Sequence, residues 1–223
     1  MEYKLEIQGQ SWSQGATLEG ELSSKSHGEP PSEKPRLLLA YGLAKKVKTK
    51  APDAFESPLE VHSSEGKFSL PLPSEAPITD KFGSLYLLVG RGEDLSQYGA
   101  LALDISPHPL VLAFLNRIKV EFRFAEKYMK RKKDWIEVKF TPPGGSEFAK
   151  VDQLVLQLRV HEGNLEVEYT FNVQVIDAEA EGISLTKKKL KFSQVYEPKD
   201  YQRGQYYNDQ AINNGLAEIF LTL

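Results

Sequence analysis

The sequence contains no cysteine, and this absence excludes three kinds of site. A chain without thiols has no disulfide framework, no thiolate zinc site and no thiol nucleophile. The first ten residues, MEYKLEIQGQ, also lack the basic start and the apolar core of a secretory signal. Both absences fit a reducing compartment, so we expect a cytoplasmic protein.

Long apolar runs and a strong net charge are missing as well. The longest apolar stretch, residues 109–115, is far shorter than the roughly 20 residues of a membrane-spanning helix. The formal net charge of −3 over 223 residues is too small to indicate a class of partner. The function therefore has to be sought in local patterns.

Motifs that carry chemistry are absent too. There is no nucleophile elbow, no Walker loop and no dinucleotide fingerprint, and Gly90 and Gly92 precede two acidic residues that would repel a phosphate. An acidic stretch, residues 177–181, suits a solvated strand end better than a cation site. None of the histidines pairs at metal-ligand spacing; they are His27, His62, His108 and His161.

We therefore expect a non-enzymatic protein with no catalytic residue, no cofactor and no metal. A hydrolase or lyase remains an open hypothesis, because catalytic residues can converge from distant strands. A deep pocket holding His108 or His161 beside carboxylates would favour it.

Alternation of period two dominates the chain and predicts an all-β fold. Tyr3, Leu5 and Ile7 alternate with polar residues, which is typical of a strand with one buried face. Residues 23–35 are rich in Ser, Gly, Pro and Glu and predict a loop. Further strands are expected at 17–22, 36–43, 59–61, 68–72, 85–89, 101–105, 120–124, 135–140, 151–160, 165–175, 183–192 and 216–223.

One segment has a helical period instead. Apolar residues between Leu110 and Ile118 fall at spacings of three and four, and Pro109 suits a first helical position. We expect an N-terminal β-sandwich over 1–107, a helical connector over 108–118 and a C-terminal β-sandwich over 119–223. The interval 196–214 is predicted as a long loop.

Several segments resemble a known family. LPLPSEAPITDKFGSLYLLV (70–89) resembles the strand, Leu-Pro and strand that end the N-terminal domain of arrestin-like proteins. The order after it is similar to that of the bacterial sporulation-control proteins, an arrestin-like family: RGEDLSQYGALALDI (91–105), SPHPLVLAFLNRI (106–118), VEFRF (120–124), DWIEVKFTPP (134–143), EFAKVDQLVLQL (147–158) and HEGNLEVEYTFNV (161–173). The match covers roughly 70–175, and the tail beyond Asp177 departs from it. The resemblance implies two arrestin-like β-sandwich domains and a regulatory or scaffolding role, with no catalytic residues.

Clusters of basic residues are the most suggestive local feature. We name them the first cluster (Lys45, Lys46, Lys48, Lys50), the second cluster (Lys127, Lys130, Arg131, Lys132, Lys133) and the third cluster (Lys187, Lys188, Lys189, Lys191). Each cation near an anionic membrane contributes about 1 kcal/mol, so four give only about millimolar binding. Lysines that line loops and strand edges against aggregation are the favoured interpretation. Nucleic-acid binding is disfavoured, because the clusters lack regularly spaced aromatic residues.

The leading hypothesis is a cytoplasmic, arrestin-like adaptor or regulator that binds a protein partner through strand edges or the groove between its halves. The alternative is a peripheral membrane or polyanion-binding protein that uses the first or second cluster. Partner identity, oligomeric state and pathway are not indicated by the sequence.

Overall fold

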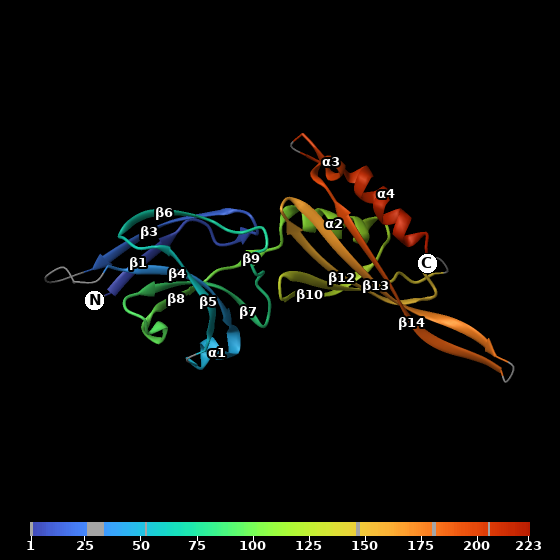
Figure 1. Cartoon of the computed structure of the whole chain (residues 1–223), viewed down its shortest axis with the longest axis horizontal. Coiled ribbons are helices and arrows are strands. Elements are labelled where there is room, and N and C mark those ends of the chain that lie inside the picture. The colour runs from blue at the N-terminus through green and yellow to red at the C-terminus, as the bar shows by residue number, and fades with distance from the viewer. Residues whose placement is uncertain (1, 26–33, 52, 146–147, 180–181, 205) are drawn as a thin grey trace. The chain divides into compact units, whose positions relative to one another are not determined.

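The chain forms two compact units, Met1–Pro107 and His108–Leu223. The computed structural model describes residues 2–25, 34–51, 53–145, 148–179, 182–204 and 206–223, with the side chains of Glu2, Lys25, Ser96 and residues 176–185 left undescribed. Each unit contains a main sheet with its own apolar core (Figure 1). Among the described residues, no helix has the length and hydropathy to span a membrane.

Most of the regular elements of unit 1 are strands. Its elements are β1 (Glu2–Ile7), β2 (Trp12–Ser13), β3 (Thr17–Lys25), β4 (Arg36–Leu43), α1 (Ala44–Lys48), β5 (Phe55–His62), β6 (Gly66–Pro71), β7 (Gly83–Gly90), the 3₁₀ turn η1 (Leu95–Gln97), β8 (Gly99–Ala102) and β9 (Ile105–Ser106).

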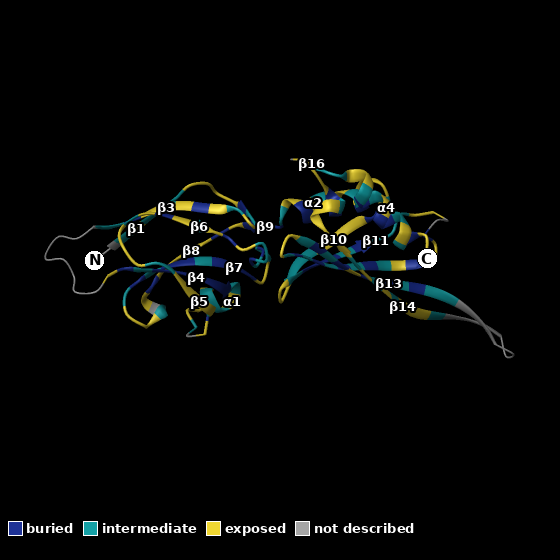
Figure 2. Ribbon diagram, turned by 45° about the horizontal axis from the view of Figure 1, so that its top comes forward, coloured by how far each residue is buried: buried dark blue, intermediate teal, exposed yellow. Residues whose placement is uncertain are grey.

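Two antiparallel sheets of unit 1 share one core. The first has the strand order β1-β3-β6 and the second has the order β5-β4-β7-β8. The apolar residues that alternate along β1, β3 and β6 pack with those of β4 and β7. Figure 2 shows that β4 and β7 are the most buried strands, which agrees with their nearly continuous apolar sequences.

Unit 2 is built on one large sheet with helices. Its elements are α2 (Pro109–Val120), β10 (Ala125–Lys132), β11 (Trp135–Thr141), β12 (Val151–His161), β13 (Asn164–Glu179), β14 (Gly182–Tyr196), α3 (Pro198–Tyr201), β15 (Gln202–Arg203), β16 (Tyr206–Tyr207) and α4 (Asp209–Phe220). The sheet is antiparallel with the strand order β10-β11-β12-β13-β14. The strands β13 and β14 continue as a two-stranded ribbon beyond the end of β12 (Figure 1).

The helices α2 and α4 cover one face of this sheet (Figure 1). Phe114 of α2 contacts Tyr169 and Tyr196, and Phe220 of α4 contacts Phe171. The expected helix near 109–118 is therefore present as α2, and its apolar side chains belong to the core of unit 2.

Two expected strands are wrong. Residues 216–223 lie mostly in α4, because Ile212, Leu216, Ile219 and Phe220 follow a helical spacing and the Asn208 side chain caps the helix at Ala211 N. Residues 120–124 are the end of α2 and a turn, in which Phe122 and Phe124 pack on Phe220.

The interval 196–214 is not one long loop. It contains α3, the short β15-β16 hairpin and the start of α4. The predicted strand 101–105 coincides with β8 only at its first two residues, since Leu103 and Ile105 turn into the core. The hairpin at 151–175 is confirmed as β12 and β13.

Candidate binding surfaces

Among the described histidines, His108 has a structural role at the start of a helix. His108 precedes α2, and its Nδ1 accepts a hydrogen bond of 3.2 Å from Leu110 N. Burial lowers its pKa from the ordinary value of 6.5. No group of three metal-ligating side chains occurs in the described part of the chain. His27 and Glu181 lie outside the described residues, as do the side chains of residues 177 and 179.

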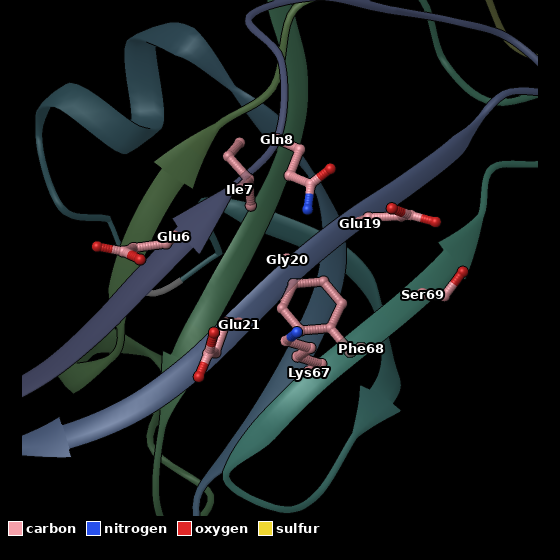
Figure 3. Close-up of a pocket in the computed structure, with 9 residues that line it drawn as sticks. All are labelled: Glu6, Ile7, Gln8, Glu19, Gly20, Glu21, Lys67, Phe68 and Ser69. Carbon is pink, nitrogen blue, oxygen red and sulfur yellow. The ribbon is translucent and has the colours of Figure 1, made fainter.

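A depression of about 680 Å³ lies on the three-stranded sheet of unit 1 (Figure 3). Register places Glu6 opposite Glu21, and Glu21 opposite Lys67 on the other side. Two carboxylates at opposed positions repel each other, and an ion pair with Lys4 compensates Glu6 and lowers its pKa. Neither His108 nor His161 lines this depression, so it gives no support to a hydrolase or lyase site.

The second lysine cluster lies on β10 and on the turn that follows. Lys130 Nζ is 2.9 Å from Glu137 Oε1, and Lys132 Nζ is 2.8 Å from Glu137 Oε2. Tyr128 Oη donates to the same carboxylate at 3.0 Å. Burial alone would raise the pKa of Glu137, whose side chain is 8% exposed, but these three hydrogen bonds lower it to about 2. Two cations of this cluster are thus held by a buried carboxylate.

The third lysine cluster lies on β14, at the opposite edge of the same sheet. Lys189 is opposite Asn172 and Lys191 is opposite Thr170, so their neighbours across the strand pair are neutral. Through the register of β11, β12 and β13, these two lysines share a sheet face with Lys130 and Lys132. The separation is four strand spacings, or roughly 19 Å. Two lysines of the second cluster and two of the third therefore share a face, although Glu137 compensates the two of the second cluster.

The first lysine cluster borders a groove in unit 1. Lys45, Lys46 and Lys48 belong to α1, Lys46 pairs with Asp53, and Lys50 lies just past the helix end. The groove has a volume of about 290 Å³ and combines α1, the start of β5, η1 and β8; it is lined by Val47, Lys50, Ala51, Ala54, Phe55, Leu95, Tyr98 and Ala100. We call it the β8 groove.

Small residues on the outer face of the four-stranded sheet make room for this groove. A side chain at Gly90 would meet the Tyr98 ring at 2.6 Å, and one at Gly42 would meet the Tyr86 ring at 2.6 Å. Both rings pack in one apolar cluster with Leu38, Ala40 and Leu88. The outer face thus has an apolar cluster of its own, against which the partly buried Phe55, Tyr86 and Leu95 pack.

The strand β8 borders the groove and ends the four-stranded sheet. Leu103 N donates to Leu85 O at 2.8 Å, and hydrogen-bonded pairs alternate along antiparallel strands. Leu101 and Gly99 therefore bond to β7, whereas the backbone N–H and C=O groups of Ala100 and Ala102 point away from it. These groups are available to a further strand.

The other edges of the three larger sheets are protected in the described residues. Edge strands β1, β6, β10 and β14 carry lysines, and β5 contains Pro58 beside Ser57, which has a φ of 45°. Lysine, proline and bulges are the usual means by which proteins prevent strand addition. The sequence GALA of β8 has none of them, and all four residues are exposed.

Comparison with known proteins gives a likeness of fold. No protein-family model matches the sequence, and no curated protein matches it. Two successive β-rich units are the arrangement of an all-β, arrestin-like protein, and a solved structure with this fold covers 99% of the chain.

That structure is Spo0M, the sporulation control protein from Bacillus subtilis. The chain is similar to it with a TM-score of 0.60 and 16% identity, over 99% of this chain and 97% of Spo0M. A second structure, alpha-2-macroglobulin of E. coli, shares 13% identity over 89% of this chain and 14% of that one, but its TM-score of 0.27 supports no argument. The arrestin-like fold implied by the sequence resemblance is therefore confirmed.

The sequence did not single out the β8 groove. The first lysine cluster lay beside it, but the apolar walls come from four segments between Val47 and Ala100. A signal was nevertheless present, because GALA (99–102), which overlaps the start of the predicted strand 101–105, contains neither a charged residue nor a proline.

Proposed function

We propose that the protein is a non-enzymatic, cytoplasmic adaptor or regulator that binds a partner protein by strand addition at β8. The observation that carries this proposal is an exposed, uncharged edge strand directly beside an apolar groove. In this mode of recognition, backbone hydrogen bonds supply affinity and side-chain pockets supply specificity.

The likeness to a sporulation control protein supports a regulatory role, since that protein is described as a control protein. The carboxylates of the depression in Figure 3 are open to solvent and have no histidine among them, which suits a surface better than a catalytic centre. The protected edges elsewhere also support β8 as the place where a partner strand joins.

Affinity capture with the variant Ala100→Pro tests this function. Proline removes the N–H that points away from β7, and an edge strand tolerates proline at such a position. We expect the wild-type chain to recover a specific partner from native lysate and Ala100→Pro to lose it, with an unchanged thermal midpoint. The control Ala100→Ser keeps the N–H and a small side chain, so it should retain the partner.

Two results would contradict the proposal. One is equal recovery of the partner by Ala100→Pro, which would place the binding site elsewhere. The other is turnover of a substrate by the purified chain in the absence of any specific partner.

A further inference from the structure

Lys50 is the charged residue that lines the β8 groove. It follows α1, its N–H donates to Val47 O at 3.1 Å, and its φ of 50° lies in the left-handed region. Glycine is the usual residue at this position after a helix, because other residues are strained there. The chain keeps a lysine instead, and its side chain is exposed.

The segments that line the groove differ in charge. Lys50 lines the groove and follows α1, whose Lys45 and Lys48 are exposed, whereas the exposed Glu93 and Asp94 precede η1, whose Leu95 lines the groove. Asp94 accepts a hydrogen bond from Gln97 Nε2 at 3.0 Å, which fixes its position beside η1. A ligand with an acidic group directed towards α1 is therefore favoured over one with a basic group there.

Strand geometry shows how such a group would enter. Alternate side chains of an added strand project onto the same sheet face. A residue opposite Ala100 shares the face of Ala100, which is the face on which Tyr98 and Leu95 line the groove. Alanine leaves this space open, so a longer side chain from the partner fits into it.

We propose that the β8 groove takes an extended segment of the partner protein that presents apolar and acidic side chains on one face, and that Lys50 selects the acidic ones. This proposal rests on the proposed function and states the chemistry of its partner. The apolar side chain lies on Tyr98 and Leu95, and the carboxylate reaches the Lys50 ammonium group. The segment joins β8 through the backbone groups of Ala100 and Ala102.

Synthetic peptides measured by fluorescence anisotropy test the selection. The probe is a labelled octapeptide of alternating residues, Thr-Leu-Thr-Glu-Thr-Leu-Thr-Glu, and the matched peptide has Lys in place of each Glu. Exposed ion pairs are weak, so we expect the full chain to bind the acidic peptide roughly two- to fivefold more tightly at low salt. The variant Lys50→Glu should reverse this preference.

The variant Lys50→Gly distinguishes a role of Lys50 in peptide preference from a role in the stability of the fold. Glycine relieves the left-handed strain, so the thermal midpoint should rise while the preference for the acidic peptide disappears. A purely structural role for Lys50 would change the midpoint alone. Lys67→Glu changes the net charge by the same amount as Lys50→Glu but lies on the three-stranded sheet, so it should leave the preference intact.

Each outcome decides between the two proposals. Equal affinities for both peptides would overturn selection by Lys50 and leave capture by β8 untouched. Peptide binding that survives Ala100→Pro would show that the peptide lies elsewhere and overturn the assignment of the groove. If the wild-type chain binds neither peptide, the assignment of the groove is also overturned. The proposed function would still be supported if Ala100→Pro loses the captured partner.

Discussion

The two units differ in how their helices cover an apolar face of a sheet. In unit 2, α2 and α4 cover the inner face of the five-stranded sheet, and Leu156, Val167 and Phe171 are fully buried there. In unit 1, the outer face of the four-stranded sheet carries an apolar cluster under a five-residue helix and a 3₁₀ turn. A short helix has little surface, so the β8 groove stays open beside it.

Charge compensation also differs between particular lysines of the two units. In unit 2, Glu137 holds two lysines of the second cluster, and Arg159 pairs with Glu166 and lies 4.5 Å from the Trp135 ring. In unit 1, Lys50 faces the groove at the end of α1. The comparison teaches that a lysine cluster in the sequence does not by itself indicate a binding surface, because a buried carboxylate can compensate it.

The largest effect should come from opening the covered face of unit 2. A Cβ at Gly215 of α4 would meet Tyr196 Oη at 2.6 Å and Gln194 Nε2 at 2.8 Å. Gly215→Leu should therefore lift α4 and lower the free energy of unfolding by about 3 kcal/mol. Thermal unfolding measures the loss of stability, and binding of an apolar dye measures the exposure of the sheet face under α4.

The control for Gly215→Leu is Gly144→Ala, because a Cβ at Gly144 meets nothing within 4 Å. This variant should leave both the thermal midpoint and dye binding unchanged. An unchanged midpoint in Gly215→Leu would show that α4 is not needed to cover the sheet.

The next effect is the pH dependence that Glu137 gives to unit 2. Its pKa in the folded chain is about 2, below the ordinary value of 4.5, so its stabilisation is complete above pH 4.5 and is lost as the pH falls towards 2. The stabilisation is at most about 3 kcal/mol, and less because Lys132 is half-exposed and its charge is screened. Glu137→Gln should lose it at pH 7 and converge with the wild type near pH 2 in denaturant titrations.

Glu168→Gln is the matched control for Glu137, since Glu168 is on the same sheet face but exposed. It should leave the pH profile unchanged. A wild-type profile that is flat between pH 5 and 2 would contradict the assigned role of Glu137.

The contrast between the units also explains which predictions from the sequence succeed. Apolar patterns predicted β4, β7, β11, β12 and β13, with a nearly continuous run in β4, because each of them buries apolar side chains. They missed β10, which is an edge strand with charged residues on both faces, and they assigned a strand to α4. The spacing of Ile212, Leu216 and Phe220 and the cap at Asn208 held the helical signal for α4.

The binding surfaces were less accessible from the sequence for a physical reason. Lys130 and Lys132 are adjacent to Glu137 only through the register of β10 and β11, and a register is set by tertiary contacts. The β8 groove depends likewise on the Tyr98 ring, which packs against Gly90. The lysine clusters were visible as composition, but their partners were not.

A smaller effect is expected from Gly90→Ala in unit 1. The added Cβ would approach the Tyr98 ring at 2.6 Å, so the ring must move and the groove must change shape. We expect a destabilisation of about 1–2 kcal/mol together with a clear loss of partner capture. Gly66→Ala is not a suitable control because its φ is 123°, whereas Gly144→Ala serves again. If Gly90→Ala still captures the partner at the wild-type level, the partner binds β8 without using the groove.

The smallest effect concerns membrane or polyanion binding by lysines, the alternative function. Lys189 and Lys191 of the third cluster have neutral neighbours across the strand pair, whereas Lys130 and Lys132 are held by Glu137. Four cations contribute about 4 kcal/mol at an anionic surface, which is close to millimolar affinity. Sedimentation with anionic liposomes at low salt should therefore show weak binding that disappears at high salt. Charge reversal at Lys189 and Lys191 should reduce it more than charge reversal at Lys130 and Lys132, and the opposite ranking would show that Glu137 does not compensate the second cluster.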